Sequence, residues 1–253
     1  MDRKFTNEID SQARFFKLYL QSSISVEGGR LLSKIAEKTN VYIFSGIIRN
    51  FFLGESFYRD LDIVVDSLDD IKDLILHNES DISVKTNSFG GLKLNVNGLN
   101  IDLWSIGNTW GIRKEGLNLT PKSLLRTAFF NFSAIVFDYN NVRFFYDEAF
   151  PNFLTARIMN VVYESNPNIP LCIVNTYYYR TKYGFGVSLH LCIWIFVNYL
   201  RLSMRQQKRS QILEDVQKEH YGSVIVDLKE LKDFVLSCRL HYIIGRPIPP
   251  KFL

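Results

Sequence analysis

The sequence predicts an α+β fold in which a mixed sheet flanked by helices is followed by a small helical domain. Apolar runs typical of buried strands alternate with amphipathic helical segments up to about residue 150, and helical spacing dominates after Pro151. Of the 253 residues, 47% are hydrophobic and 22% are charged, as is usual for a chain that builds a core. We therefore expect one domain over residues 1–150 and a second, helical domain over residues 151–253.

The first predicted elements are a helix, a strand, a short helix and a second strand. Residues 29–38 place leucine and isoleucine side chains on one helical stripe, and the buried run VYIF follows at residues 41–44. Residues 47–54 are compatible with a short helix that ends at a glycine. LDIVV, at residues 61–65, has the composition of a second buried strand.

Two hairpins are predicted farther along, after an amphipathic helix over residues 67–76. The first covers residues 90–106 and turns at Asn97 and Gly98, a dipeptide favoured in two-residue hairpin turns. The second covers residues 133–145 and turns at residues 139–141. Five helical segments are then expected, near residues 153–164, 171–183, 187–204, 207–219 and 227–238.

Nothing in the sequence indicates secretion, membrane insertion or a cysteine-based zinc site. The three cysteines are widely spaced and form no CxxC pair, and the first twenty residues lack the apolar stretch of a signal peptide. The apolar window 185–200 is about one turn short of a membrane span and contains His190 and Asn198, so we interpret it as a buried helix. We expect a cytoplasmic protein with no membrane partner.

The formal net charge of +4 is unevenly distributed along the chain. Residues 1–150 contain 17 basic and 19 acidic residues, a net charge of −2, whereas residues 151–253 contain 13 and 7, a net charge of +6. A basic second half can hold a polyanion such as RNA beside a chemically active first half. A solvated helical surface explains the excess equally well.

Three carboxylates form the candidate catalytic set. Asp60 and Asp62 lie two residues apart at the start of an apolar strand, so strand alternation directs both side chains to one face. Asp102 lies in a second apolar strand and could approach them from there. Carboxylate oxygens are hard ligands that suit Mg²⁺ and substrate phosphates, and three of them can bind two ions. A solvated acidic strand end is the alternative for the Asp-x-Asp spacing alone.

A small-residue turn precedes these carboxylates. Ser45 and Gly46 end the first strand just ahead of the short helix, where backbone amides could approach phosphate oxygens without obstruction. Arg49, one helical turn later, could reach the same phosphates. An ordinary strand-to-helix turn would look the same in the sequence.

Together, residues 41–65 (VYIFSGIIRNFFLGESFYRDLDIVV) resemble the signature of the class II tRNA nucleotidyltransferase and poly(A) polymerase head domain, within the polymerase β superfamily. The resemblance extends more weakly to about residue 190. Asp102 falls where that family places its third carboxylate, and SLLRTAFFNFSAIVFD is similar to the family's R-R-D-F-T-I-N-A segment. The run that ends in Lys182, Gly184 and Phe185 is similar to the family's neck motif.

The resemblance implies a Mg²⁺-dependent nucleotidyltransferase that moves NMP from an NTP such as ATP to an acceptor hydroxyl and releases pyrophosphate. Asp60 and Asp62 would bind both of two Mg²⁺ ions, and Asp102 would hold the ion that lowers the pKa of the acceptor hydroxyl. The turn residues and Arg49 would cradle the triphosphate. Arg126 and Asn131 match family residues that contact the phosphates and sugar of the nucleotide, or that support the site.

The sequence departs from the family pattern at several positions. Ser45 replaces a glycine, Asn50 replaces the aspartate of the V-R-D step, and Thr127 replaces the aspartate of the R-R-D step. In the neck, the family uses an Asp and an Arg to read the base edge of CTP or ATP, whereas Ile169 and Cys172 stand here. Because an isoleucine and a thiol cannot supply those hydrogen bonds, templated addition of C, C and A is not supported.

RNA, and preferentially the 3′ end of tRNA, is the expected acceptor. A basic run, Arg201, Arg205, Lys208 and Arg209, is predicted to present a helical face suited to RNA phosphates, although a solvated helix would show the same spacing. A protein side chain or a small molecule is the enzymatic alternative, and a toxin or defence effector is one biological setting. A degenerate head that binds nucleotide or RNA without chemistry is the non-enzymatic alternative. The NTP and the oligomeric state stay open.

Overall fold

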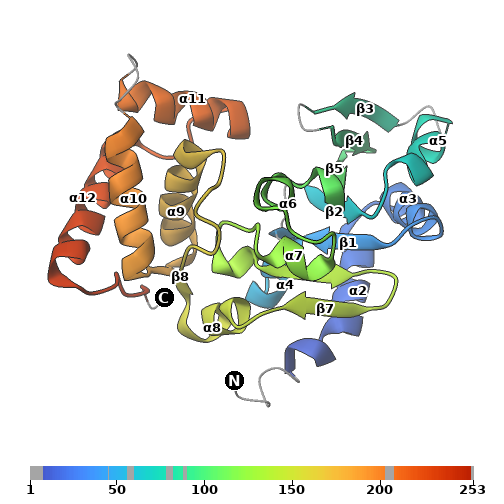
Figure 1. Ribbon diagram of the computed structural model, residues 1–253, viewed down its shortest axis with the longest axis horizontal. Coiled ribbons are helices and arrows are strands. Elements are labelled where there is room, and N and C mark those ends of the chain that lie inside the picture. The colour runs from blue at the N-terminus through green and yellow to red at the C-terminus, as the bar shows by residue number, and fades with distance from the viewer. Residues whose placement is uncertain are drawn as a thin grey trace. The chain divides into compact units, whose positions relative to one another are not determined.

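The computed structural model describes residues 8–44, 46–55, 60–77, 82–87, 90–202 and 208–251 (Figure 1). The chain divides into two compact units. The first, here called the sheet unit, comprises Met1–Ala128 and Phe132–Leu154, and the second, the helical unit, comprises Phe129–Asn131 and Thr155–Leu253. The join predicted between residues 150 and 151 falls inside helix α8 (Ala149–Ala156), which spans the division between the units.

The sheet unit is built on a mixed sheet that has seven strands in the described part of the chain, in the order β3-β4-β5-β2-β1-β6-β7. The β2–β5 pair is parallel, and the other neighbouring strands are antiparallel. This mixed sheet confirms the predicted α+β class. The strands are β1 (Val41–Phe44), β2 (Leu61–Val65), β3 (Ile82–Thr86), β4 (Leu92–Val96), β5 (Leu99–Ser105), β6 (Ile135–Asp138) and β7 (Arg143–Tyr146).

One face of the sheet carries the main hydrophobic core. Helices α2 (Ala13–Ser23) and α3 (Val26–Ala36) pack their apolar stripes against strand residues such as Ile43 and Ile63. At the centre, the buried ring of Phe16 lies edge-on to Phe137 with ring centroids 4.7 Å apart. Helix α2 was not predicted from the sequence, although Phe16 and Leu20 have helical spacing.

The other face carries a smaller core beneath two short helices, α6 (Trp110–Glu115) and α7 (Pro121–Leu125). Tyr42, Val64 and Val136 contribute to it from three neighbouring strands. Because side chains alternate along a strand, this is the face opposite to that of Ile43 and Ile63. It is also the face that carries the carboxylates described below.

Most predicted elements of the sheet unit are confirmed. The short helix is α4 (Gly46–Leu53), the acidic helix is α5 (Asp69–His77), and both hairpins are present as β4–β5 and β6–β7. Asn97 and Gly98 have φ angles of 48° and 83°, the left-handed values that a two-residue turn of this type requires. Strand β3 was not predicted.

The helical unit contains α9 (Ile169–Tyr183), α10 (Leu189–Arg201), α11 (Arg209–Tyr221) and α12 (Leu228–Ile244), close to four of the predicted segments. The helix predicted over residues 153–164 is wrong beyond Ala156. Arg157 has a φ of 53°, which ends α8, and β8 (Ile158–Met159) follows, parallel to β9 (Gly186–Val187). Within the described ranges, none of the helices has both the length and the apolar character that crossing a membrane requires.

Candidate active site

Strand register brings the two most separated carboxylates side by side. Asp62 in β2 lies directly opposite Asp102 in the parallel neighbour β5, so both side chains are directed to the same face of the sheet. Asp60 directly precedes β2, and the buried Leu61 separates it from Asp62, as alternation along an extended chain requires. All three predicted carboxylates therefore belong to one face and one end of the β2–β5 pair.

The predicted phosphate turn lies at the same end of the sheet. Strand β1 runs antiparallel to β2, and its last residue, Phe44, is opposite Asp62. Gly46 then begins α4, and a Cβ atom built on Gly46 would meet no atom within 4 Å, so the backbone there is open to approach. Ser45 lies outside the described residues. The first turn of α4 thus begins near the end of β1 that pairs with Asp62.

Arg49 is placed differently from the prediction that it reaches phosphates directly. Its side chain is buried, and its guanidinium donates two hydrogen bonds, of 3.0 and 2.9 Å, to Oδ1 of Asn50. The guanidinium also lies over the ring of Phe132, at 5.5 Å from the ring centroid. Asn50 stands where the family resemblance places an aspartate, and the oxygen of its neutral amide accepts both hydrogen bonds.

Lys93 is a site residue that the sequence reasoning missed. It lies in β4 directly opposite Asp102, and its Nζ is 3.9 Å from Oδ1 of Asp102. The side chains of Lys93 and Asp102 are 63% and 29% exposed, so the pair is open to solvent. The signal was present in the hairpin, because counting back from a turn at Asn97 and Gly98 places residue 93 opposite residue 102.

The carboxylates are the right type of ligand for a divalent cation, but few of them are grouped together. Carboxylate oxygens are the ligands that Mg²⁺ prefers, and Asp60 and Asp62 project from one strand edge. Among the residues that the structure describes, however, no group of three or more His, Cys, Asp or Glu side chains is arranged to hold a metal ion. The residues that fit Mg²⁺ by their chemistry and position are therefore the pair Asp60 and Asp62.

Arg126 and Asn131 have opposite environments. Arg126 is exposed at the C-terminal end of α7. Asn131 is 5% exposed, donates to the carbonyl of Ile158 and accepts from the amide of Asn160. Of the two roles that the resemblance left open for these residues, the surroundings of Asn131 favour support of the local backbone, whereas Arg126 is accessible.

The predicted basic face does not form on a single helix. Helix α10 ends at Arg201, and Lys208 is the extended N-cap residue of α11, so a continuous helical face through Arg201, Lys208 and Arg209 is wrong. Arg209 instead donates to the carbonyl of Leu200, 3.2 Å away, and lies over the ring of Tyr199. Arg205 lies outside the described residues. Arg201 and Lys208 are exposed.

The neck positions that read the base in the family are used structurally here. Ile169 is the first residue of α9, directly after the N-cap residue Asn168, whose side chain accepts a hydrogen bond from the amide of Leu171. Cys172 is buried one turn into the helix, and this burial raises the pKa of its thiol far above the ordinary value. A neutral thiol in the core offers no charged group to a nucleotide base.

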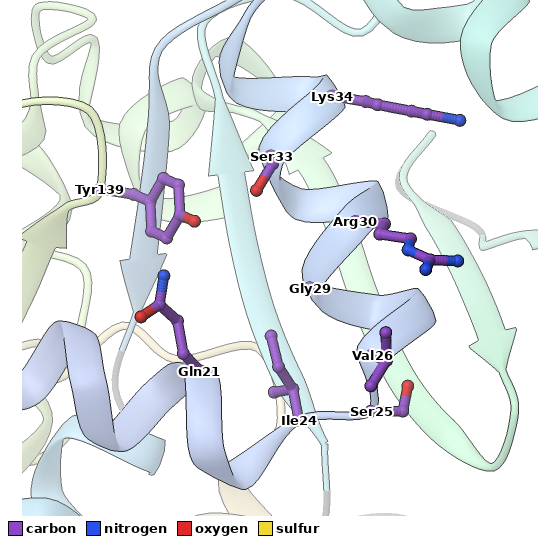
Figure 2. A pocket seen from close by; sticks show the side chains of 9 residues that line it. All are labelled: Gln21, Ile24, Ser25, Val26, Gly29, Arg30, Ser33, Lys34 and Tyr139. Carbon is purple, nitrogen blue, oxygen red and sulfur yellow. The ribbon is translucent and has the colours of Figure 1, made fainter.

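Two surface hollows are lined by residues other than the carboxylates. One, of about 510 Å³, lies between α2 and α3. Among the residues that line it, Arg30 and Lys34 project from α3 away from Gln21 and Tyr139, as Figure 2 shows. The other, of about 420 Å³, belongs to the helical unit and is lined by His190 and Glu164, whose Nε2 and Oε1 atoms are hydrogen-bonded at 2.7 Å. Neither includes any of the three aspartates.

Solved structures match this fold. A tRNA-processing enzyme solved with CTP superposes with a TM-score of 0.59 at 18% identity, over 82% of this chain and 56% of that chain. A CCA-adding enzyme solved with ATP gives a TM-score of 0.60 at 15% identity, over 96% and 56%. The Thermotoga maritima CCA-adding enzyme complexed with tRNA gives 0.58 at 16% identity, over 97% and 53%.

The chain has the polymerase β-like nucleotidyltransferase fold. The fold resemblance predicted from residues 41–65 is thereby confirmed. The chain spans a little over half the length of these solved nucleotidyltransferases. No protein-family model matches the chain, and no curated protein matches it in sequence.

Proposed function

We propose that the protein is a Mg²⁺-dependent nucleotidyltransferase that moves NMP from an NTP to an acceptor hydroxyl and releases pyrophosphate. The observation that carries the proposal is the register of β2 with β5, which sets Asp62 opposite Asp102 beside the start of α4. The fold supports it, since the matching structures include enzymes solved with CTP, ATP and tRNA.

Each part of this edge has a proposed role. Asp60 and Asp62 would hold Mg²⁺, which when bound supplies positive charge to the triphosphate and to the leaving pyrophosphate. The amides of the first turn of α4, opened by Gly46, would bind phosphate oxygens. Asp102 would face the acceptor hydroxyl, whose oxygen would bond to the α-phosphorus as the bond to pyrophosphate breaks, and the Asp102 carboxylate would take up the hydroxyl proton.

Arg49 and Arg126 would contribute to nucleotide binding in different ways. The guanidinium of the buried Arg49, held by Asn50, would lie behind the phosphate turn and support it. The exposed Arg126 would contact the nucleotide directly. Since Ile169 and Cys172 offer no polar pair for a base edge, we propose that selection among NTPs is weaker than in a CCA-adding enzyme.

RNA, with the 3′ end of tRNA preferred, is the acceptor that we propose. The net charge of +6 over residues 151–253 favours a polyanion, and the exposed Arg201 and Lys208 are available to phosphates. A protein or small-molecule acceptor would show much less dependence on ionic strength. The proposed setting is cytoplasmic, and a toxin or defence effector is one role in which such an activity would act.

A nucleotide- or RNA-binding module without chemistry is the second candidate. The burial of Cys172 and the loss of the neighbouring charged positions favour it, because both remove groups with which the family grips its substrate. The position of Asp62 opposite Asp102 favours the enzyme instead, since a binding module has no need of two adjacent carboxylates that repel each other.

Transfer of label to RNA tests the proposal. The protein is incubated with each α-labelled NTP, Mg²⁺ and total RNA. Labelling that falls at least about 10³-fold in Asp62→Ala, but not in the matched control Asp70→Ala on the exposed first turn of α5, supports the enzyme. Equal labelling by wild type and Asp62→Ala would refute the assignment. NTP-dependent thermal stabilisation without Mg²⁺ and without turnover would support the binding module.

A further inference from the structure

A row of charged side chains crosses the candidate site from strand to strand. Lys93 in β4, Asp102 in β5 and Asp62 in β2 are consecutive partners in register, so all three side chains are on one face. Neighbouring strands are about 4.8 Å apart, which places the ammonium group within reach of the nearer carboxylate but a strand beyond the farther one. The row thus reads cation, carboxylate, carboxylate.

The Lys93 ammonium lies beside the Asp102 carboxylate. Its Nζ lies 3.9 Å from Oδ1 of Asp102, and the two side chains retain access to solvent. Two carboxylates directly opposite each other repel, and a positive charge beside one of them offsets that repulsion. In a nucleotidyltransferase with two metal ions, a second ion would supply this positive charge.

A divalent ion on Asp102 and the Lys93 ammonium would compete for one carboxylate. Mg²⁺ binds carboxylate oxygens at about 2.0–2.1 Å, so an ion there would lie close to Nζ unless the lysine moved away. The like charges repel, which lowers the affinity of Asp102 for the ion. In keeping with this, the described residues contain no group of three carboxylates arranged to hold a metal.

We propose that Lys93 takes the place of the second metal ion, so that this site binds one divalent cation, on Asp60 and Asp62, and uses the lysine ammonium as its other cation. The inference rests on the proposed nucleotidyltransferase function and replaces the two ions that the family resemblance implies. It also predicts how the ions are distributed: the aspartates before and in β2 hold the metal, and Asp102 holds the lysine.

The number of bound ions tests this without any measurement of turnover. Mn²⁺ is titrated into the full-length protein, and the EPR signal of aqueous Mn²⁺ reports the free ion. We expect one Mn²⁺ on the wild type and none at this site in Asp62→Asn. In Lys93→Met, which keeps the length of the side chain and removes its charge, we expect a second ion with a dissociation constant at least tenfold below that of the wild type.

Two further variants are the controls. Lys93→Arg keeps the charge and should bind one ion. Lys85→Met removes a lysine that is opposite Lys93 in β3, on the same face but one strand farther from Asp102, and should also bind one ion. Thermal unfolding of each variant establishes that it is folded.

The outcomes separate the two proposals. Two ions on the wild type, with affinities equal to those of Lys93→Met, would overturn the role of Lys93 and leave the nucleotidyltransferase assignment standing. No bound ion on either protein, together with no labelling of RNA, would overturn both. A second ion that appears equally in Lys85→Met would show a general charge effect and overturn the specific role.

Discussion

In the sheet unit, the candidate carboxylates Asp62 and Asp102 lie on neighbouring strands, near the open backbone at Gly46. In the helical unit, the positions that the family uses to read a base are part of a helix, and the side chain of Cys172 is buried. Asp62 and Asp102 lie opposite each other because strands β2 and β5 are in register. Ile169 and Cys172, by contrast, belong to helix α9, and Cys172 is buried there. The difference teaches that the groups suited to chemistry are retained in one unit, while those suited to reading a base are absent from the other.

The largest expected effect is the loss of stability on replacing Cys172, which tests whether this helical-unit position is structural. Cys172→Arg restores the residue type of the family but places an unpaired charge in the core, which should lower the free energy of unfolding by about 3–5 kcal/mol. Urea denaturation measures the change. The matched variant Thr181→Arg, on an exposed position of the same helix, should cost less than about 0.5 kcal/mol. Equal stability of the two variants would show that position 172 can face a ligand.

A smaller effect is expected at Asn131. Asn131→Ala leaves the carbonyl of Ile158 and the amide of Asn160 without their side-chain partner, which should cost about 1–3 kcal/mol of stability. Arg126→Ala, on an exposed residue, should change stability little and raise the KM for the NTP instead. Thermal unfolding and NTP titration of both variants make the comparison. A raised KM with unchanged stability in Asn131→Ala would assign it to the nucleotide.

The basic residues of the helical unit should also divide into one that stabilises the fold and two that bind RNA. The expected changes in the free energy of unfolding or binding are about 1 kcal/mol or less. Arg209→Ala removes a hydrogen bond to the end of α10 and should mainly lower stability. Arg201→Ala and Lys208→Ala should leave stability unchanged and each reduce by about one the slope of log affinity for RNA against log salt. An unchanged slope in both would remove RNA phosphates as their partners.

The smallest expected effect is a pH dependence in the helical unit. Burial, and secondarily the hydrogen bond to Glu230, raises the pKa of Tyr177 to about 12. Because the folded state favours the neutral phenol, its contribution to stability is complete below about pH 10, the unfolded pKa, and is lost as the pH rises toward 12. The difference in urea midpoint between wild type and Tyr177→Phe should therefore shrink between pH 9.5 and pH 11.5. A constant difference would contradict the shift.

Local patterns predicted the sheet unit well because its strands and turns are short-range features. The Asn97 and Gly98 turn and the buried runs at residues 41–44 and 61–65 each identify themselves within a few residues. The placement of Asp102 came from family resemblance, since no local pattern shows that β5 lies parallel to β2. Lys93 was within reach of the sequence, because its position follows from counting along the hairpin.

The failures in the helical unit have a different physical origin. The helix predicted beyond Ala156 ends because Arg157 adopts a left-handed conformation, a choice that the pairing of β8 with β9 stabilises and that no helical pattern reveals. The single basic face failed because Arg209 binds the end of the preceding helix, a contact between two elements. Both depend on tertiary structure, which outweighs the local preference of the chain.

The two-residue turn at Asn97 and Gly98 has a consequence well beyond its own position. Pairing Val96 with Leu99 determines every later pair in the hairpin, so a one-residue slip would bring Leu92 or Leu94, and not Lys93, opposite Asp102. Under the proposed function, the length of a surface loop would then govern how many divalent ions the site binds. Chains that share these three aspartates but differ in the length of that loop are expected to differ in how strongly their activity depends on the magnesium concentration.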